Sequence, residues 1–193
     1  MSLTGAAQND IMADVVERCE NIRVMGLVKD LVLYGKLYYS GKRRFLDTLN
    51  KGLGMKNSPD KQYFLMDDVM LVDRRGDQDK IEGTCLVPRE SVAFIGAFDE
   101  TRPSMSESID SVKFYPWRKK EPHEVSVVLG DDFSLTGTVY LDPNDGSSLA
   151  PGSDECFLPA TEVTVRSSRF VRDLKFTFVA LNTRLMVLLS FQP

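Results

Sequence analysis

The fold is decided by a stretch in the second half of the chain, residues 125–141, which reads VSVVLGDDFSLTGTVYL. Val125 to Leu129 is a run of apolar and β-branched residues typical of a strand, and Gly130 begins a turn with the composition of a hairpin. The next strand runs from Phe133 to Leu141, and Gly137 interrupts it as at a bulge or bend where a small barrel turns a corner. This stretch therefore predicts an antiparallel hairpin.

The same kind of pattern predicts further strands in both halves of the chain. Three follow the hairpin, over residues 162–166, 174–180 and 184–191, and Leu181-Asn182-Thr183 is expected to be the tight turn between the last two. Five lie in the first half, over residues 27–34, 35–40, 68–73, 80–87 and 91–98. Short strands rich in aromatic and β-branched residues, with no long helix between them, favour antiparallel barrels over βαβ units.

The two halves also resemble each other. Residues 64–98 align without a gap on residues 157–191, at an offset of 93, and apolar residues fall at matching positions. Upstream, residues 34–39 resemble residues 136–141 at an offset of 102, which implies nine extra residues in the intervening loop of the first copy. We interpret this match as an internal duplication. The alternative is that any two β-rich segments look alike under alternating patterns.

We therefore predict a mainly β protein of two tandem five-stranded antiparallel small barrels, related by internal duplication and preceded by an N-terminal helix. The N-terminal segment is residues 1–26, where Ile11, Val15, Cys19 and Ile22 recur at helical spacing. The first barrel is residues 27–98 and the second is residues 123–193. Residues 99–122, rich in Pro and Ser, form the linker between them.

Composition bounds the class of protein. Charged residues make up 27% of the 193 residues and the formal net charge is −4, which argues against a disordered chain and against a globally basic nucleic-acid binder. The longest apolar runs, such as Leu185 to Leu189, are too short to span a membrane, and the N-terminus lacks a secretory signature. Three cysteines cannot form a fully paired disulfide framework. We expect a cytoplasmic protein with reduced thiols.

Few residues support catalysis. His123 is the single histidine, so a Ser-His-Asp or Cys-His mechanism would need that residue, and a histidine-rich zinc site is excluded. No glycine-rich phosphate-binding motif is present, which makes nucleotide hydrolysis improbable. Neighbouring acids such as Asp67 and Asp68 could act as acid and base, although acids in strand and turn contexts are usually solvent-facing. We expect no cofactor and no enzyme activity.

Basic residues gather in two places. The loop over residues 41–61 has a local charge of +4, and Phe45, Leu46, Leu49 and Leu53 predict a short helix in it, with Gly54 as its C-cap. A second basic cluster follows the only tryptophan. The candidate ligand-binding or RNA-binding residues are Arg43, Arg44, Lys51, Trp117, Arg118, Lys119, Lys120 and Asn182. The alternatives are a barrel lid whose basic residues are merely solvated, and a tryptophan that packs between the barrels.

A helix followed by five strands, with a glycine inside the second strand and a tight turn between the fourth and fifth, resembles the Sm and Sm-like fold. SH3-like barrels have a similar succession of strands. The Sm-like family binds RNA through an Asp-x-x-x-Asn loop and an Arg-Gly-x-Asn turn. The nearest counterparts here are Asp142 and, in Leu181-Asn182-Thr183-Arg184, Asn182. The first copy has Pro88-Arg89-Glu90 at the turn and Asp47-Thr48-Leu49-Asn50 in the loop. The resemblance implies RNA binding at these positions.

The function predicted from the sequence is a non-catalytic binding or assembly module of unknown ligand, because side chains fill the interiors of small barrels and leave loops, rims and strand edges for binding. A protein partner or self-association is expected, and a homo-oligomer is possible through pairing of strand edges. Two alternatives stay open. One is RNA binding in the Sm-like manner, and the other is an enzyme with a carboxylate site around Asp67 and Asp68.

Overall fold

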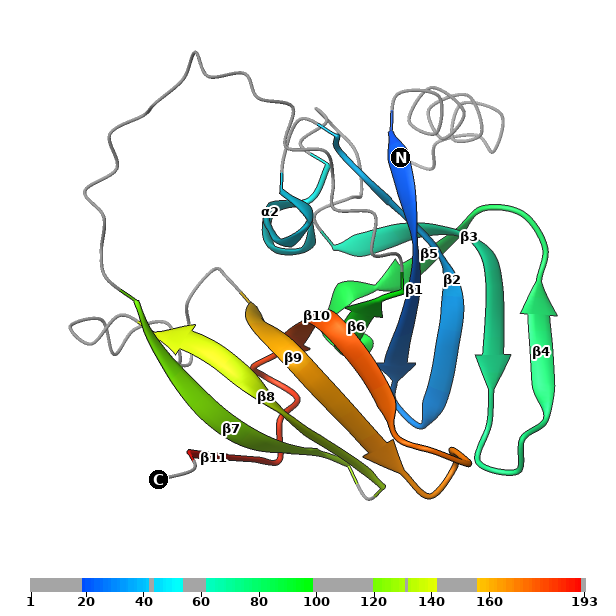
Figure 1. Ribbon diagram of the computed structural model, residues 1–193. Helices are drawn as coiled ribbons and strands as arrows, with labels where there is room; N and C mark the ends of the chain where they lie inside the picture. Colours follow the sequence, from blue (N-terminus) through cyan, green and yellow to red (C-terminus); the bar gives the residue numbers. More distant parts are fainter. Residues whose placement is uncertain are drawn as a thin grey trace, which may run out of the picture.

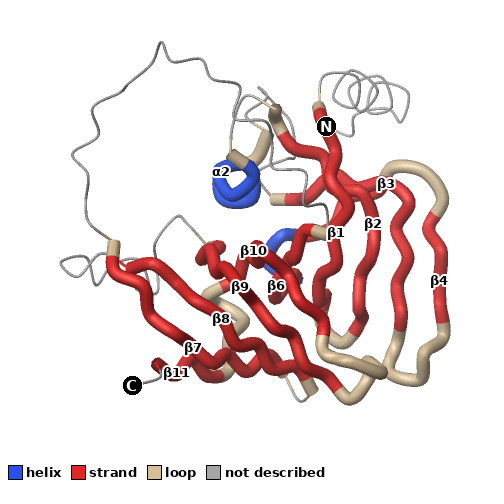
Figure 2. Tube along the Cα trace, viewed as in Figure 1, coloured by secondary structure: helices blue, strands red, loops and turns tan. Residues whose placement is uncertain are grey.

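A computed structural model of the chain describes residues 19–41, 44–53, 62–98, 120–130, 132–141 and 156–191. In chain order its elements are β1 (Glu20–Val28), β2 (Leu31–Tyr39), α2 (Phe45–Lys51), β3 (Tyr63–Val72), β4 (Gln78–Ile81), β5 (Cys85–Pro88), the 3-10 turn η2 (Arg89–Ser91), β6 (Val92–Ala97), β7 (Glu121–Leu129), β8 (Phe133–Leu141), β9 (Phe157–Ser167), β10 (Leu174–Asn182) and β11 (Leu188–Phe191). Strands dominate, and α2 is the single α-helix among the described residues (Figure 2). The predicted mainly β class is confirmed.

All eleven strands belong to one antiparallel sheet, in the order β11-β7-β8-β9-β10-β6-β1-β2-β3-β4, with β5 also pairing with β3 (Figure 1). The sheet is not closed, because β11 and β4 stand at its two ends. The structure therefore does not show the two separate tandem barrels that the sequence predicts. The reason is that β6 and β10, which would be edge strands of isolated halves, pair with each other and satisfy their backbone groups in one continuous sheet.

The strand order is the same on both sides of the β6–β10 pair. In the second half of the chain, the order across the sheet is β11-β7-β8-β9-β10. The fifth strand of this half therefore lies next to its first strand, and the second, third and fourth strands follow. In the first half the path is β6-β1-β2-β3, after which β4 and β5 both pair along β3 as two pieces of a fourth strand. The last strand of each half therefore lies beside its first strand.

The start of the sheet differs from the prediction. A turn at Lys29 and Asp30 separates β1 from β2, so the single strand expected over residues 27–34 is wrong. Lys29 has a φ of 55°, a left-handed conformation unusual for lysine, and no Gly or Asn marks the turn. Ile22 lies in β1 rather than in a helix. Cys19, just before β1, is not helical either. The part of the expected N-terminal helix before Cys19, and residues 99–119 of the expected linker, lie outside the described residues, so the division into domains stays a prediction.

Two glycines allow the sheet to bend at matching places. The β2–β3 ladder shifts register between Tyr34 and Lys36, around Gly35, and the β8–β9 ladder shifts between Thr136 and Thr138, around Gly137. A Cβ atom on Gly137 would lie 2.8 Å from Cγ2 of Val163, so only glycine leaves room for the facing strand. The bulge expected at Gly137 is confirmed.

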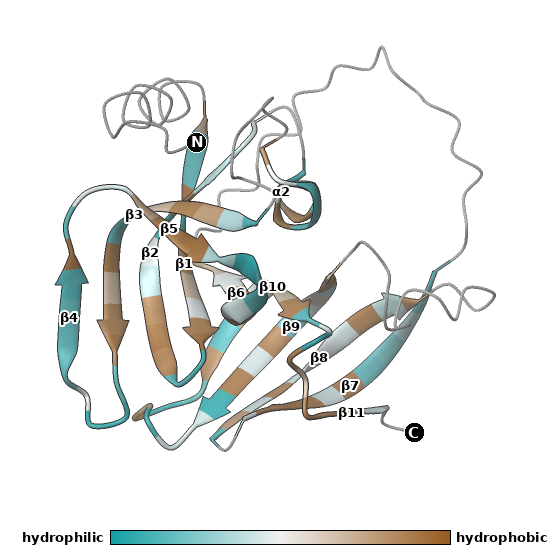
Figure 3. Ribbon diagram, turned by 180° about the vertical axis from the view of Figure 1, so that it is seen from behind, coloured by the Kyte–Doolittle hydropathy of each residue, from teal (hydrophilic) through white to brown (hydrophobic). Residues whose placement is uncertain are grey.

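Two large apolar clusters form most of the core, and each includes residues from both halves. The larger cluster joins Met25 and Phe94 to buried side chains of β7 to β10. The other joins the first half, including Leu49 of α2, to Phe157 and Ala180 of the second. Figure 3 shows the alternation of hydrophobic and hydrophilic residues along β8 and β9 that buries one face of these strands. The halves are therefore held together by packing as well as by backbone pairing.

The short helix predicted in the basic loop is confirmed as α2, which runs from Phe45 to Lys51. It ends at Gly52, which has a φ of 77°, and not at Gly54 as expected. Within the described ranges, no helix has the length and apolar character needed to cross a membrane.

Candidate functional site

The β6–β10 pair forms the junction between the two halves. Its register places Gly96, Ile95 and Phe94 opposite Val179, Ala180 and Leu181. Both strands consist of small and apolar residues here, so they pack between the two core clusters without burying a charge. The junction shows that edge strands of this protein can join two sheets into one.

Asn182, the last residue of β10, reinforces one end of the junction. Its side chain is only 1% exposed, and its Nδ2 donates a hydrogen bond to the Val92 carbonyl oxygen at 2.9 Å. Its Oδ1 accepts a hydrogen bond from the Arg184 backbone N–H at 3.1 Å. The sequence predicts Asn182 as a binding residue in a turn, but the nitrogen and the oxygen of its side-chain amide both form hydrogen bonds that stabilise the fold.

Asn50 on α2 makes a second tie at the same end. Its Nδ2 donates to the carbonyl oxygen of Phe157 at 3.0 Å, and its Oδ1 accepts from the N–H of Phe157 at 2.8 Å. The amide therefore imitates a neighbouring strand at the start of β9. Leu49 beside it is fully buried in the core. The helix of the first half is thus attached to a strand of the second.

Arg169 ties the halves together at the other end of β10. Its Nη1 donates to the Asp30 carbonyl oxygen at 2.5 Å, and its Nε lies 3.2 Å from Asp132 Oδ2. The guanidinium also lies over the Phe133 ring, 5.0 Å from the ring centroid. Hydrogen bonds from Ser168 and Ser167, with a smaller contribution from Arg169, lower the pKa of Asp132 to about 2. This carboxylate stays ionised and holds the arginine in place.

A cleft of about 500 Å³ opens beside the Asn182 end of the junction. Its lining residues include Asn50, Tyr63, Arg89, Asn182 and Arg184. Arg89 is 9% exposed, its guanidinium lies 5.2 Å from the centroid of the Phe64 ring, and its Nη2 donates to the Thr48 carbonyl oxygen at 3.5 Å. The exposed Arg184 adds a second cation. Arginine, asparagine and tyrosine side chains together suit an anionic ligand with polar edges.

The residues predicted as a binding site are dispersed. Asn182 lines the cleft, and Lys51 ends α2 directly after Asn50, which also lines it. Arg44 immediately precedes α2 and pairs with Asp47 at 3.0 Å. Lys120 is exposed just before β7 and does not line the cleft. Arg43, Trp117, Arg118 and Lys119 lie outside the described residues.

The paired acids Asp67 and Asp68 have separate partners. Tyr38 Oη donates to Asp67 Oδ2 at 2.5 Å, and burial together with this bond raises the pKa of Tyr38 to about 12. Lys36 Nζ lies 2.8 Å from Asp68 Oδ2, and this contact lowers the pKa of the Asp68 carboxyl. Neither acid lines the cleft. Among the described residues, no cluster of three or more His, Cys, Asp or Glu side chains could hold a metal ion.

Among the described residues, three strands at the ends of the sheet, β11, β4 and β5, have an unpaired edge, and we call those of β11 and β5 the free edges. One is the side of β11 that faces away from β7, and the other is the side of β5 that faces away from β3. Neither β5 nor β11 contains a charged residue. Leu188 of β11 is 56% exposed, and Val187 and Phe191 beside it are also exposed. Uncharged open edges of this kind are places where another strand can pair.

Comparisons of the chain with protein-family models, with curated proteins and with solved structures found no match. The functional argument therefore rests on the geometry of this chain.

Sequence reasoning missed Asn50, Arg89 and Arg169 as junction and cleft residues. The sequence indicates Asn50 and Arg89 only through the loop and the turn of the first copy that correspond to the Sm-like motifs. The one local signal for Arg89 is its position in Pro88-Arg89-Glu90, the turn aligned with that of Asn182. Nothing in the sequence marks an arginine as buried, because its burial comes from contacts with Thr48 and Phe64, both distant along the chain.

Proposed function

We propose that this protein is a non-catalytic assembly module whose copies associate by antiparallel pairing of their free edges. The observation that carries this proposal is the β6–β10 junction, where a last strand and a fourth strand already pair within one chain. The same two kinds of strand, β11 and β5, remain open at opposite ends of the sheet. Each copy therefore has one edge of each kind to offer to its neighbours.

An internal duplication of two Sm-like units, which we also propose, gives the register of this contact. Met66 pairs with Cys85 in the first half and Ala160 pairs with Val179 in the second, so both partners are shifted by 94 residues. Val24 pairs with Gly35 and Val125 with Gly137, so β7 corresponds to β1 with a shift of 101 residues. Met25 pairs with Gly96 and Ser126 with Ser190, so the last strands are again shifted by 94. This offset exceeds by one the value of 93 expected from the sequence.

The shift predicts which residues meet between copies. Applied to the β6–β10 ladder, it places Ser190, Leu189 and Leu188 of one copy opposite Cys85, Leu86 and Val87 of the next. The contact is heterologous, since two different edges meet, so repetition gives either a closed ring or an open filament. It would cover the exposed Leu188 and satisfy the open backbone groups of both strands.

A charge placed on the edge tests the proposal. We expect the wild-type protein to elute as an oligomer in size-exclusion chromatography with light scattering, and Leu188→Lys to elute at a smaller mass, because a charged edge opposes strand pairing. Val171→Lys is the matched control, since it also removes an exposed apolar residue but lies in the β9–β10 turn. A wild-type monomer at every concentration would contradict the proposal.

A disulfide tests the register itself. We expect Ser190→Cys to form covalent oligomers with the native Cys85 of neighbouring copies under mild oxidation, seen on a non-reducing gel. The same variant with Cys85→Ser should give none, although Cys19 and Cys156 remain. Cross-linking that survives the removal of Cys85 would show that the copies meet elsewhere.

RNA binding in the Sm-like manner is a second candidate, supported by the cleft beside Asn182. The cleft brings together Arg89, Arg184 and Tyr63, which suit a phosphate and a base. In filter binding at low salt, we expect Arg184→Glu to release a labelled oligouridine that the wild type retains. Arg172→Glu, an exposed arginine in the β9–β10 turn, serves as the control. No retention by the wild type would remove this candidate.

A further inference from the structure

We infer that the protein carries a separate site, an aromatic trough that binds flexible single-stranded nucleic acid, either RNA or DNA. The trough is formed by Tyr34 on β2, Phe98 directly after β6, and two hollows that flank this ring pair. It shares no lining residue with the cleft at the junction. The inference depends neither on the assembly proposed above nor on RNA binding in that cleft.

The exposed ring of Phe98, supported by the buried ring of Phe176, forms the platform of the trough. Phe98 is 45% exposed and its ring lies 5.2 Å from that of Phe176, which is 4% exposed. Phe98 also lies against Tyr34, with 6.3 Å between ring centroids and 14° between ring planes. A Cβ atom on Gly96 would lie 2.8 Å from the Phe176 ring, so glycine at this position lets Phe176 support Phe98. The platform is held in a fixed orientation.

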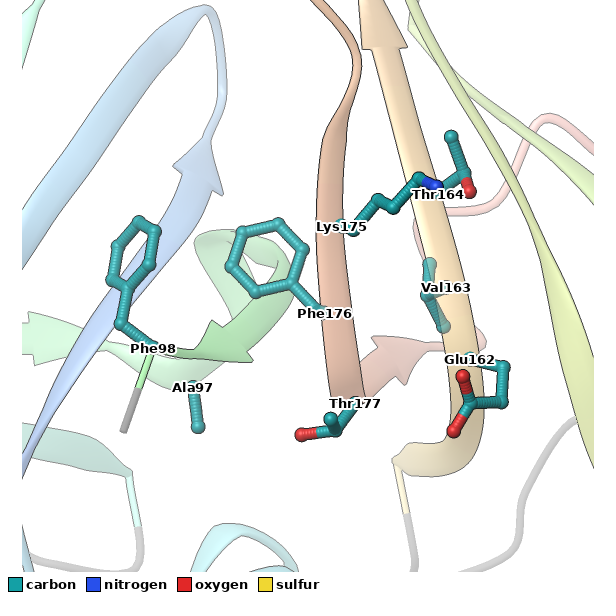
Figure 4. Close-up of a pocket in the computed structure, with 8 residues that line it drawn as sticks. All are labelled: Ala97, Phe98, Glu162, Val163, Thr164, Lys175, Phe176 and Thr177. Atoms are coloured by element: carbon teal, nitrogen blue, oxygen red, sulfur yellow. The ribbon is translucent and has the colours of Figure 1, made fainter. Parts of the chain in front are cut away.

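The first hollow, of about 300 Å³, lies between Phe98 and strands β9 and β10 (Figure 4). Along β10, Lys175 and Thr177 are exposed while Phe176 between them is buried. The Lys175 ammonium forms no ion pair or hydrogen bond with any other described residue. Glu162 also lines this hollow and adds a carboxylate acceptor. The hollow therefore holds an available cation, which extends from β10 toward Thr164 on the side of Phe176 away from Phe98 (Figure 4).

The second hollow, of about 350 Å³, lies on the Tyr34 side of the pair. Three arginines line it, but two are already engaged: Arg74 pairs with Asp30 at 2.8 Å and Arg169 with Asp132 at 3.2 Å. The Arg75 guanidinium is exposed, and no other described side chain pairs with it. The trough thus has an available cation on each side of its rings.

This arrangement matches the chemistry of an unpaired nucleic-acid strand. A base stacks on an exposed aromatic ring irrespective of sequence, and the adjoining phosphates then lie near Lys175 and Arg75. The bases of a duplex are already stacked and paired, so they cannot reach the platform. Glu162 can accept a hydrogen bond from an amino group of a base. An acidic peptide would use the two cations but would not need Phe98.

Fluorescence anisotropy of the full chain with labelled twelve-residue RNA and DNA oligonucleotides tests the trough. We expect Phe98→Ala to bind both about tenfold more weakly, the loss of one stacked base. Tyr140→Ala is the matched control, since Tyr140 is also 45% exposed and lines neither hollow. We expect Lys175→Gln and Arg75→Gln each to weaken binding and to reduce its salt dependence, because each variant removes one phosphate contact. Lys80→Gln, at an exposed lysine of β4 that lines neither the hollows nor the cleft, should bind like the wild type.

The outcomes separate this site from the others. Binding that is weakened by Arg184→Glu but unchanged by Phe98→Ala and Lys175→Gln would overturn the trough and favour the cleft. A labelled polyglutamate peptide that binds as tightly as the oligonucleotides would also overturn it, by showing that charge alone suffices. Lys175→Gln covers the case in which Phe98→Ala fails to fold, since Lys175 is exposed and has no partner to lose. Leu188→Lys, which separates copies, should leave the anisotropy result unchanged.

Discussion

The junction and the free edges use the same kinds of strand, but only the junction is reinforced by side chains. Three polar ties accompany the β6–β10 ladder: Asn182 and Asn50 at one end and Arg169 at the other. Under the proposed duplication, Pro88 stands at the free edge where Asn182 stands at the junction. Proline has no side-chain donor, so the tie made by Asn182 cannot be repeated there. Under the proposed assembly, we therefore expect the junction to be permanent and pairing at the free edges to be reversible.

The largest expected effect on stability comes from truncating Phe94 at the junction, which is compared with truncation of its equivalent at the free edge, Leu188. Phe94 is fully buried at the junction, so Phe94→Ala should lower the free energy of unfolding by about 3 to 5 kcal/mol. Leu188, its counterpart at the free edge, is largely exposed, and Leu188→Ala should cost about 0.5 kcal/mol or less. Urea denaturation followed by circular dichroism measures both. Equal losses would mean that the free edge is covered within the chain.

A smaller effect is expected from the tie made by Asn182. Asn182→Ala removes the donor to the Val92 carbonyl and leaves that buried oxygen without its partner, which should cost about 2 kcal/mol. Arg184→Ala, an exposed neighbour, is the control and should stay close to the wild type. The same denaturation experiment applies. A loss no greater than that of the control would show that the ladder holds the junction without help.

The tie that Asn50 of α2 makes should contribute less to the free energy of unfolding than that of Asn182, because it contacts the end of a strand. Asn50→Asp keeps the acceptor for the Phe157 N–H but removes the donor to the Phe157 carbonyl, and it should cost about 1 kcal/mol. Hydrogen exchange would show faster opening at the start of β9 than in β10. Unchanged exchange at Phe157 would mean that α2 does not hold the second half.

The smallest expected effect concerns pH at the Arg169 end. The pKa of Asp132 is lowered to about 2 in the folded protein, below its value of about 3.9 in an unfolded chain. This carboxylate therefore stabilises the folded state above about pH 4, and its contribution is lost as the pH falls toward 2. Asp132→Asn should lose less stability than the wild type over that interval in thermal melts. If the melting temperatures of the variant and the wild type fell equally with pH, Asp132 would not act as a charged partner of Arg169.

Much of the local structure could be predicted from the sequence. Residues Phe133 to Leu141 form a strand with the same bounds as expected, and the bulge at Gly137 follows from the lack of room for a Cβ atom. The helix α2 was visible as apolar residues at helical spacing. The turn at Lys29 and Asp30 was not, because it uses a left-handed lysine where the usual signal is glycine or asparagine. Prediction succeeded where neighbouring residues fix the backbone.

The candidate site was largely beyond prediction. Of the residues named from the sequence, Asn182 lies in the cleft, but its amide is used to hold the junction. Arg89 and Asn50 gain their positions from partners more than forty residues away along the chain. Phe98 becomes a platform only because the rings of Phe176 and Tyr34, from two other strands, lie against it.

The amino-acid sequence by itself determined that this chain forms short antiparallel strands, bent at glycines, with a short helix in the basic loop, because alternation and backbone freedom are local properties. Only the tertiary structure decided that the two halves share one open sheet, which edges remain unpaired and which rings and cations face the same hollow. Those features depend on which strands meet across long stretches of chain, and the alternating pattern is equally compatible with closed or joined sheets.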